Sequence, residues 1–170
     1  MRIQNIVLIG FSGVLMIAAV SAAQRRHVPT GQDDMKVDVS IALQVAAQPY
    51  RFDGKAVCQH AATASIYNVV AEMWTVQQSE GQRSITLTVW RPKNSPGNLF
   101  SLSVTNGGKS YVVNTVKVGG AGIVQGSGKV TLTTSGAGGT FTVDARADGA
   151  AITGTIKCSA FTAAIAEAGN

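Results

Sequence analysis

Two cysteines and one histidine are the residues of this chain whose types suggest a disulfide or a metal site. Cys58 and Cys158 are the two cysteines of the chain. In an oxidising compartment such a pair is usually joined, and the two thiols together with His60 would make an incomplete ligand set for a metal ion or a haem. We therefore expect a structural disulfide between the two cysteines, and neither a metal site nor a bound cofactor.

The same histidine limits the catalytic chemistry that the chain could perform. His60 is the one histidine between residues 37 and 160, so a hydrolytic triad would have to use it. Many serines and threonines could partner it, and the sequence contains no G-x-S-x-G nucleophile elbow. Glu72 lies in an apolar segment and could be a general acid, although an outward-facing strand residue explains it more simply. We predict no catalytic residues and a protein that is not an enzyme.

The exposed chemistry of most interest is an aromatic residue followed by basic ones. Trp90, Arg91 and Lys93 lead from a strand into a loop, and alternation places Trp90 opposite the aliphatic face of that strand. An exposed Trp beside cations could stack on a sugar or dock an anionic polymer, and Trp74 and Tyr67 could widen such a surface. We predict these five residues as ligand-binding candidates; the alternative is that Trp90 packs under a loop or against a second core.

Composition and charge narrow the classes of partner. Only 14% of the residues are charged, 19 are glycine, and the formal net charge is +5. The lysines and arginines are scattered and form no single basic stripe, so nucleic acid is not an expected partner. A cell-envelope glycan or a protein partner is compatible with this mild charge.

The N-terminal segment predicts export. The sequence has no charged side chain between Arg2 and Arg25, and its apolar run ends in Val-Ser-Ala-Ala. This is the layout of a cleaved signal peptide, here residues 1–23, which would place the protein in the periplasm or outside the cell. An uncleaved leader that anchors the chain in the inner membrane is the alternative, and it is the one membrane contact that we expect. Residues 24–36 are polar and predict a flexible lead-in.

The remaining chain predicts one all-β domain over residues 37–160. Apolar and polar residues alternate along 37–45, 83–90 and 99–104, which is the period of a strand with one buried face. A long strand is predicted over 66–77. Turns are predicted at three dipeptides, Asp53-Gly54, Asn106-Gly107 and Asp148-Gly149.

Eight to nine short strands with turn signals between them favour an antiparallel β-sandwich or a small β-barrel. Residues 161–170 lose the alternation and predict a C-terminal tail. The pattern separates neither sandwich from barrel nor monomer from oligomer.

These observations lead to a functional expectation. We expect an exported, non-catalytic β-domain of the bacterial cell envelope or secreted fraction that binds a glycan, an envelope polymer or a protein partner through exposed loops. One alternative is a structural or assembly subunit that pairs through strand edges. A hydrolase that uses His60 is the other.

Overall fold

The computed structural model describes residues 35–93, 97–118 and 120–164. The predicted signal peptide and all but the last two residues of the predicted lead-in lie outside these ranges. The described residues form ten strands and contain no helix. The strands are β1 (Lys36–Val45), β2 (Gln48–Ile66), β3 (Val69–Glu80), β4 (Arg83–Pro92), β5 (Leu99–Asn106), β6 (Lys109–Asn114), β7 (Ser127–Ser135), β8 (Gly138–Ala147), β9 (Ala150–Cys158) and β10 (Thr162–Ala163).

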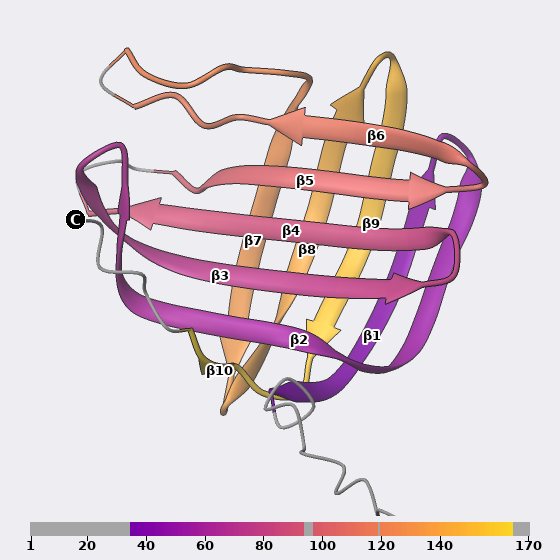
Figure 1. Cartoon of the computed structure of the whole chain (residues 1–170), viewed down its shortest axis with the longest axis horizontal. Helices are drawn as coiled ribbons and strands as arrows, with labels where there is room; N and C mark the ends of the chain where they lie inside the picture. The colour runs from indigo at the N-terminus through magenta and orange to yellow at the C-terminus, as the bar shows by residue number, and fades with distance from the viewer. Residues whose placement is uncertain (1–34, 94–96, 119, 165–170) are drawn as a thin grey trace, which may run out of the picture.

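The strands form one antiparallel sheet that is nearly closed into a flattened barrel. Their order is β6-β5-β4-β3-β2-β1-β9-β8-β7, and the short β10 adds to β2 in parallel. Figure 1 shows two layers, with β2 to β6 in front and β7, β8, β9 and β1 crossing behind them at a steep angle. The predicted all-β antiparallel fold is confirmed. β10 lies within the segment for which a tail was predicted.

The long strand β2 connects the two layers at a corner. Its first half pairs with β1, from Gln48 opposite Val45 to Val57 opposite Lys36. Its second half, from Val57 onward, pairs with β3 on its other edge. Because β2 changes partner at Val57, one continuous strand belongs to the back layer at its start and to the front layer at its end (Figure 1).

The core lies between the two layers and is built from the inward-facing residues of every long strand. Alternate residues are buried along β1, β4, β5 and β8, which is the consequence of the period-two pattern in the sequence. The largest wholly buried side chains are Tyr50, Phe100, Phe141, Ile41, Leu43, Ile85, Leu87, Leu102, Ile152 and Ile156.

A disulfide crosses this core. Cys58 in β2 and Cys158 in β9 are bonded, with 6.3 Å between their Cα atoms, and both residues are buried. The bridge joins the two layers at the end of the barrel where β1 begins. A buried disulfide indicates that the protein resides in an oxidising compartment, and it removes both thiols from any metal or haem site.

The predicted turn at Asp53-Gly54 is wrong, because β2 runs straight through it. Asp53 lies opposite Ser40 in the β1–β2 ladder. Gly54 instead makes room for a neighbour, since a Cβ atom there would lie 3.0 Å from the ring of Phe52. The turn lies earlier, at Ala46 and Ala47, whose φ angles of 50° and 67° suit a two-residue hairpin.

Two other hairpins also differ from the sequence-based prediction. The long strand predicted over 66–77 is interrupted by a turn at Tyr67 and Asn68, which have φ angles of 47° and 65°. The hairpin predicted at Asn106-Gly107 exists, but its two turn residues are Gly107 and Gly108, and Asn106 is the last residue of β5. Glycine is favoured at both turn positions because both need a positive φ.

Candidate functional site

The predicted binding residues Trp90 and Arg91 lie on opposite sides of β4. They are adjacent in the strand, so the alternation of the backbone separates their side chains. Trp90 lies in register with Met73 and Leu99 on the outer surface of the front layer. Arg91 lies in register with Glu72 on the face that carries the core, at the open end of the barrel. The structure therefore does not bring the tryptophan and this cation together.

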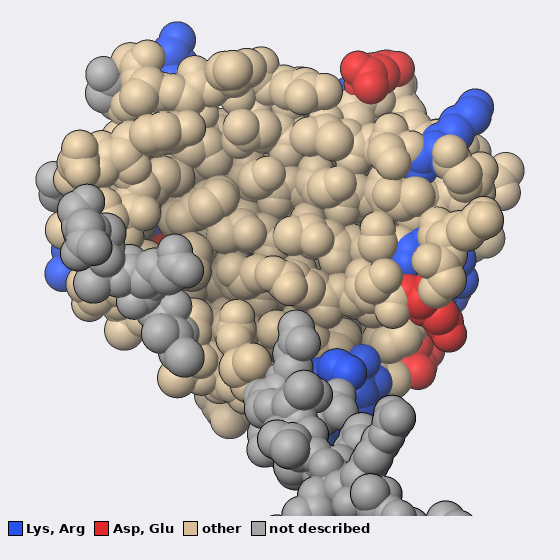
Figure 2. Space-filling view, in the orientation of Figure 1, with Lys and Arg blue, Asp and Glu red and all other residues tan. Residues whose placement is uncertain are grey.

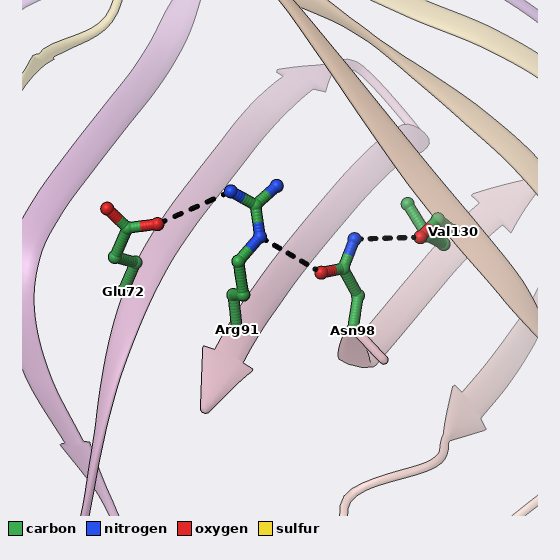
Figure 3. Close-up of polar contacts among 4 residues, drawn as sticks. All are labelled: Glu72, Arg91, Asn98 and Val130. Atoms are coloured by element: carbon green, nitrogen blue, oxygen red, sulfur yellow. Dashed lines mark hydrogen bonds and ion pairs between the residues drawn. The ribbon is translucent and has the colours of Figure 1, made fainter. Parts of the chain in front are cut away.

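Arg91 belongs to a network that ties β4 to its neighbours (Figure 3). Its Nη1 atom lies 3.4 Å from Oε2 of Glu72, and its Nε atom donates a hydrogen bond to Oδ1 of Asn98 at 3.5 Å. The amide of Asn98 in turn donates to the carbonyl of Val130 in β7 at 3.2 Å. Because β6 and β7 end the sheet, this contact holds the front layer against an edge strand of the back layer.

Trp74 lies beneath this network and is not exposed. Its exposed fraction is 4%, its ring lies 4.8 Å from the guanidinium of Arg91, and it stacks on His60 with 4.8 Å between centroids. These contacts place Trp74 inside the barrel, where it does not widen an outer binding surface. Lys93 is exposed just beyond β4, and its backbone N–H donates to the carbonyl of Val70.

Within the part of the chain that the structure describes, no serine or threonine hydroxyl forms a hydrogen bond with the His60 side chain. Its Nε2 atom is buried and has no hydrogen-bond partner among the residues that the structure describes. A triad needs a nucleophile within hydrogen-bond reach of the imidazole. The same part of the chain contains no cluster of three or more His, Cys, Asp or Glu residues that could hold a metal ion.

Trp90 and Tyr67 do lie together, in a shallow cleft on the outer surface. The cleft has a volume of about 300 Å³, and we call it the aromatic cleft; it is lined by Ser65, Ile66, Tyr67, Trp90, Ser101, Asn114 and Val116. Tyr67 is 52% exposed at the tip of the β2–β3 hairpin. Trp90 is half-buried, because one side of it packs on a small cluster that includes Ile66, Ala71 and Val116. The packing that the sequence offered as the alternative for Trp90 is thus present, and its role in binding stays a prediction.

The segment after β6 shapes the wall of this cleft. Gly122, with a φ of 103°, comes so close that an added Cβ would lie 2.2 Å from the carbonyl oxygen of Val116 and 3.3 Å from the ring of Tyr67. The side chain of Asn114 holds the segment from both sides. Its amide donates to the carbonyl of Ile123 at 2.9 Å, and its Oδ1 accepts from the N–H of Val116 at 3.0 Å.

The cleft continues into a broad polar surface without charge. The outward-facing residues of β3 to β6 lie in rows across the four strands, and we call them the hydroxyl face. Each row is in register from strand to strand. The rows are Ser79, Ser84, Thr105 and Ser110; Gln77, Thr86, Ser103 and Val112; and Thr75, Thr88, Ser101 and Asn114.

The charged residues of these four strands all occupy the alternate positions, on the opposite side of the sheet from the hydroxyl face. They lie at or within a few residues of the strand ends and are Glu72, Glu80, Arg83, Arg91 and Lys109. Figure 2 shows the result, in which lysine, arginine and acidic side chains are confined to the border of the front surface. The alternation along residues 83–90 predicts one polar side of that strand but not the whole face, because the rows depend on the register of four strands.

Comparison with protein-family models, with curated proteins and with solved structures gives no match for this chain. The hydroxyl face and the aromatic cleft are therefore the features that bear on function. Within the described ranges, no helix has the length and apolar character needed to cross a membrane.

Proposed function

We propose that the protein is an exported, non-catalytic binding module for a neutral glycan. The glycan lies against the hydroxyl face, and one sugar ring stacks in the aromatic cleft. The observation that carries the proposal is the continuity of the two features, because a charge-free surface of hydroxyl and amide groups ends at Trp90 and Tyr67.

The chemistry of the surface matches the chemistry of a sugar. A pyranose ring has an apolar C–H face that can pack on an aromatic ring, while its hydroxyls need donors and acceptors at the edge. Tyr67 and Trp90 offer the first, and Ser101 and Asn114 offer the second in the same cleft. A cleft this shallow leaves much of its ligand in water, so we expect weak affinity for one ring and useful affinity for a polymer.

The absence of charge on this face selects the class of glycan. A uronic acid or sulfated polymer would lose hydration and find no cation among the residues of the hydroxyl face. Arg91 is directed to the other side of β4 and is paired with Glu72. The possibility of an anionic polymer, which the Trp-Arg-Pro-Lys sequence suggested, is therefore less favoured by the geometry than a neutral one.

The test is retention on insoluble neutral polysaccharides, with cellulose, chitin, xylan and starch as probes. We expect wild-type protein to be retained on at least one of them, and Tyr67→Ser and Trp90→Ala each to weaken retention about tenfold, which corresponds to about 1.4 kcal/mol. Tyr67 is exposed, so its variant should fold normally even if Trp90→Ala loses some packing. The matched control is Thr142→Val, which alters an exposed hydroxyl on the back layer and should change nothing.

Two results would count against the proposal. Wild-type protein that passes through all four matrices has no neutral glycan partner of this kind. Retention that is unchanged in Tyr67→Ser, in a variant whose melting temperature equals that of wild type, would mean that the aromatic cleft is not the site.

The assembly alternative is favoured by one feature, which is the presence of edge strands β6 and β7 at the two ends of the sheet. Edge strands offer unpaired backbone groups to another chain. Its test is analytical ultracentrifugation over a wide concentration range. A protein that stays monomeric at the highest concentration would contradict this alternative.

A further inference from the structure

A second cleft borders the hydroxyl face at the end opposite Trp90, where β1 and β2 adjoin it. This cleft has a volume of about 450 Å³, and its polar lining comprises Lys36, Lys55, Gln77, Gln78, Ser79, Ser84 and Thr86. It forms at the corner of the barrel, just before β2 joins β3 at Val57. Two clefts thus lie on one surface, and the same strand contributes to both, because Ser84 and Thr86 belong to β4 as Trp90 does.

The outward-facing residues of β4 connect the two clefts in a straight line. They are Ser84, Thr86, Thr88 and Trp90, and six residue steps separate the first from the last. A strand advances about 3.3 Å per residue, so the line is about 20 Å long. β4 lies between β3 and β5 in the middle of the front layer (Figure 1).

The line is flanked by hydrogen-bonding groups from Ser84 to Thr88, and by the apolar Met73 and Leu99 at Trp90. Thr86 lies between Gln77 and Ser103, and Thr88 lies between Thr75 and Ser101. Of these flanking groups, Thr75 is buried. Neighbouring strands are about 4.8 Å apart, so the track across three strands is about 10 Å wide. That width accommodates one sugar chain with its hydroxyls directed to both sides. Charged side chains lie at the border of this surface (Figure 2).

We infer that the ligand is a linear neutral oligosaccharide chain that lies along β4 and occupies both clefts at once. This inference rests on the function proposed above and deepens it, since it sets the direction of the chain and its minimum length. A pyranose unit linked through opposite ring positions advances a chain by about 5 Å, given bond lengths of about 1.5 Å. The track of about 20 Å therefore holds about four units.

The far cleft offers a charged donor, which the aromatic cleft lacks. Lys55 forms an ion pair with Asp38 at 2.9 Å, and both side chains are largely exposed. An exposed pair of this kind contributes little to stability, so Lys55 can be altered without unfolding the protein. Its ammonium group can donate to the hydroxyls of the last sugar unit, as charged groups form strong hydrogen bonds with neutral acceptors.

The experiment measures affinity against chain length. Isothermal titration uses oligosaccharides of two to six units from the glucose, N-acetylglucosamine, xylose and mannose series. In the series that binds, we expect affinity to rise at least tenfold between two and four units and to change less than twofold beyond five. Lys55→Gln should weaken binding of the pentamer about threefold or more while the affinity for the dimer stays the same, and Thr142→Val is the control.

The outcomes separate this inference from the proposed function. Equal affinity for the dimer and the hexamer overturns the two-cleft chain and leaves the neutral-glycan function standing. A Lys55→Gln variant that binds the pentamer as wild type does also overturns it. Failure of every oligosaccharide to bind overturns the neutral-glycan function itself, and with it the inference.

Discussion

Removal of the disulfide should cost this protein a large part of its stability. The perturbation is the double variant Cys58→Ala, Cys158→Ala, which keeps both positions small and apolar. The bridge closes a loop of 100 residues between β2 and β9. In the chain-entropy account, a loop of that length stabilises the folded state by about 4.7 kcal/mol, chiefly because it restricts the unfolded chain.

The magnitude can be converted into two observables. Engineered removals often give somewhat less than the entropic figure, so we expect a loss of about 3–5 kcal/mol in the free energy of unfolding. For a domain of this size that corresponds to a fall in melting temperature of about 10–20 °C. The slope of unfolding against urea should also increase, because an unfolded chain without the bridge exposes more surface.

The assay is urea unfolding followed by tryptophan fluorescence. Trp74 is a suitable probe, since it is 4% exposed in the folded protein and becomes exposed on unfolding. Dithiothreitol should move the wild-type curve toward that of the double variant and should leave the double variant unchanged. A loss below 1 kcal/mol, with the bridge shown to be intact in wild type by mass, would refute the reasoning.

Two further predictions concern the backbone and the pH dependence. Gly154→Ala should lower the free energy of unfolding in urea by about 3 kcal/mol, because φ is +136° and the new Cβ would lie 2.1 Å from the carbonyl oxygen of Ala42. The control Gly136→Ala, with φ +56° and open space around it, should lower it by about 1 kcal/mol. Equal losses in the two variants would contradict this prediction. Burial raises the pKa of Tyr50 above its ordinary 10.0. The folded state therefore favours the neutral phenol, and this contribution to stability is fully present below pH 10 and is lost as the pH rises through the pKa of the folded state. Tyr50→Phe should cost about 1–3 kcal/mol at neutral pH, since it leaves Oε1 of Gln78 without its donor. It should also show a smaller fall in stability above pH 10, and parallel profiles in an alkaline urea series would disprove that.

The all-β class could be predicted because it depends on local alternation. Residues 83–90 alternate cleanly and lie within β4, and the pattern at 37–45 marks β1 almost to the residue. The turns were harder to predict, because two of them use residues without a turn signature. Ala46 and Tyr67 both have positive φ, and side chains such as these adopt it only where the ladders on both sides require the turn.

The candidate site could be predicted only residue by residue. The alternation placed Trp90 correctly on the outer surface, whereas the grouping of Trp90 with Arg91 overlooked that neighbouring residues of a strand face opposite sides. The aromatic cleft brings Tyr67 beside Trp90 and Asn114, and it depends on the pairing of distant strands and on the course of the segment after β6. Such contacts between distant parts of the chain carry no local signal.

The pairing of β1 with β9 sets the order in which this chain can fold. Val39 lies opposite Cys158 and Val45 opposite Ile152, so the first strand needs a neighbour from the end of the domain. Strands β2 to β6 are joined by short hairpins and can pair as soon as each is synthesised, whereas contacts between distant segments form slowly. One edge of β1 must therefore wait until β9 has been made, and the disulfide must wait with it. The sheet is therefore complete only after β7, β8 and β9, the last long strands of the domain, have joined β1.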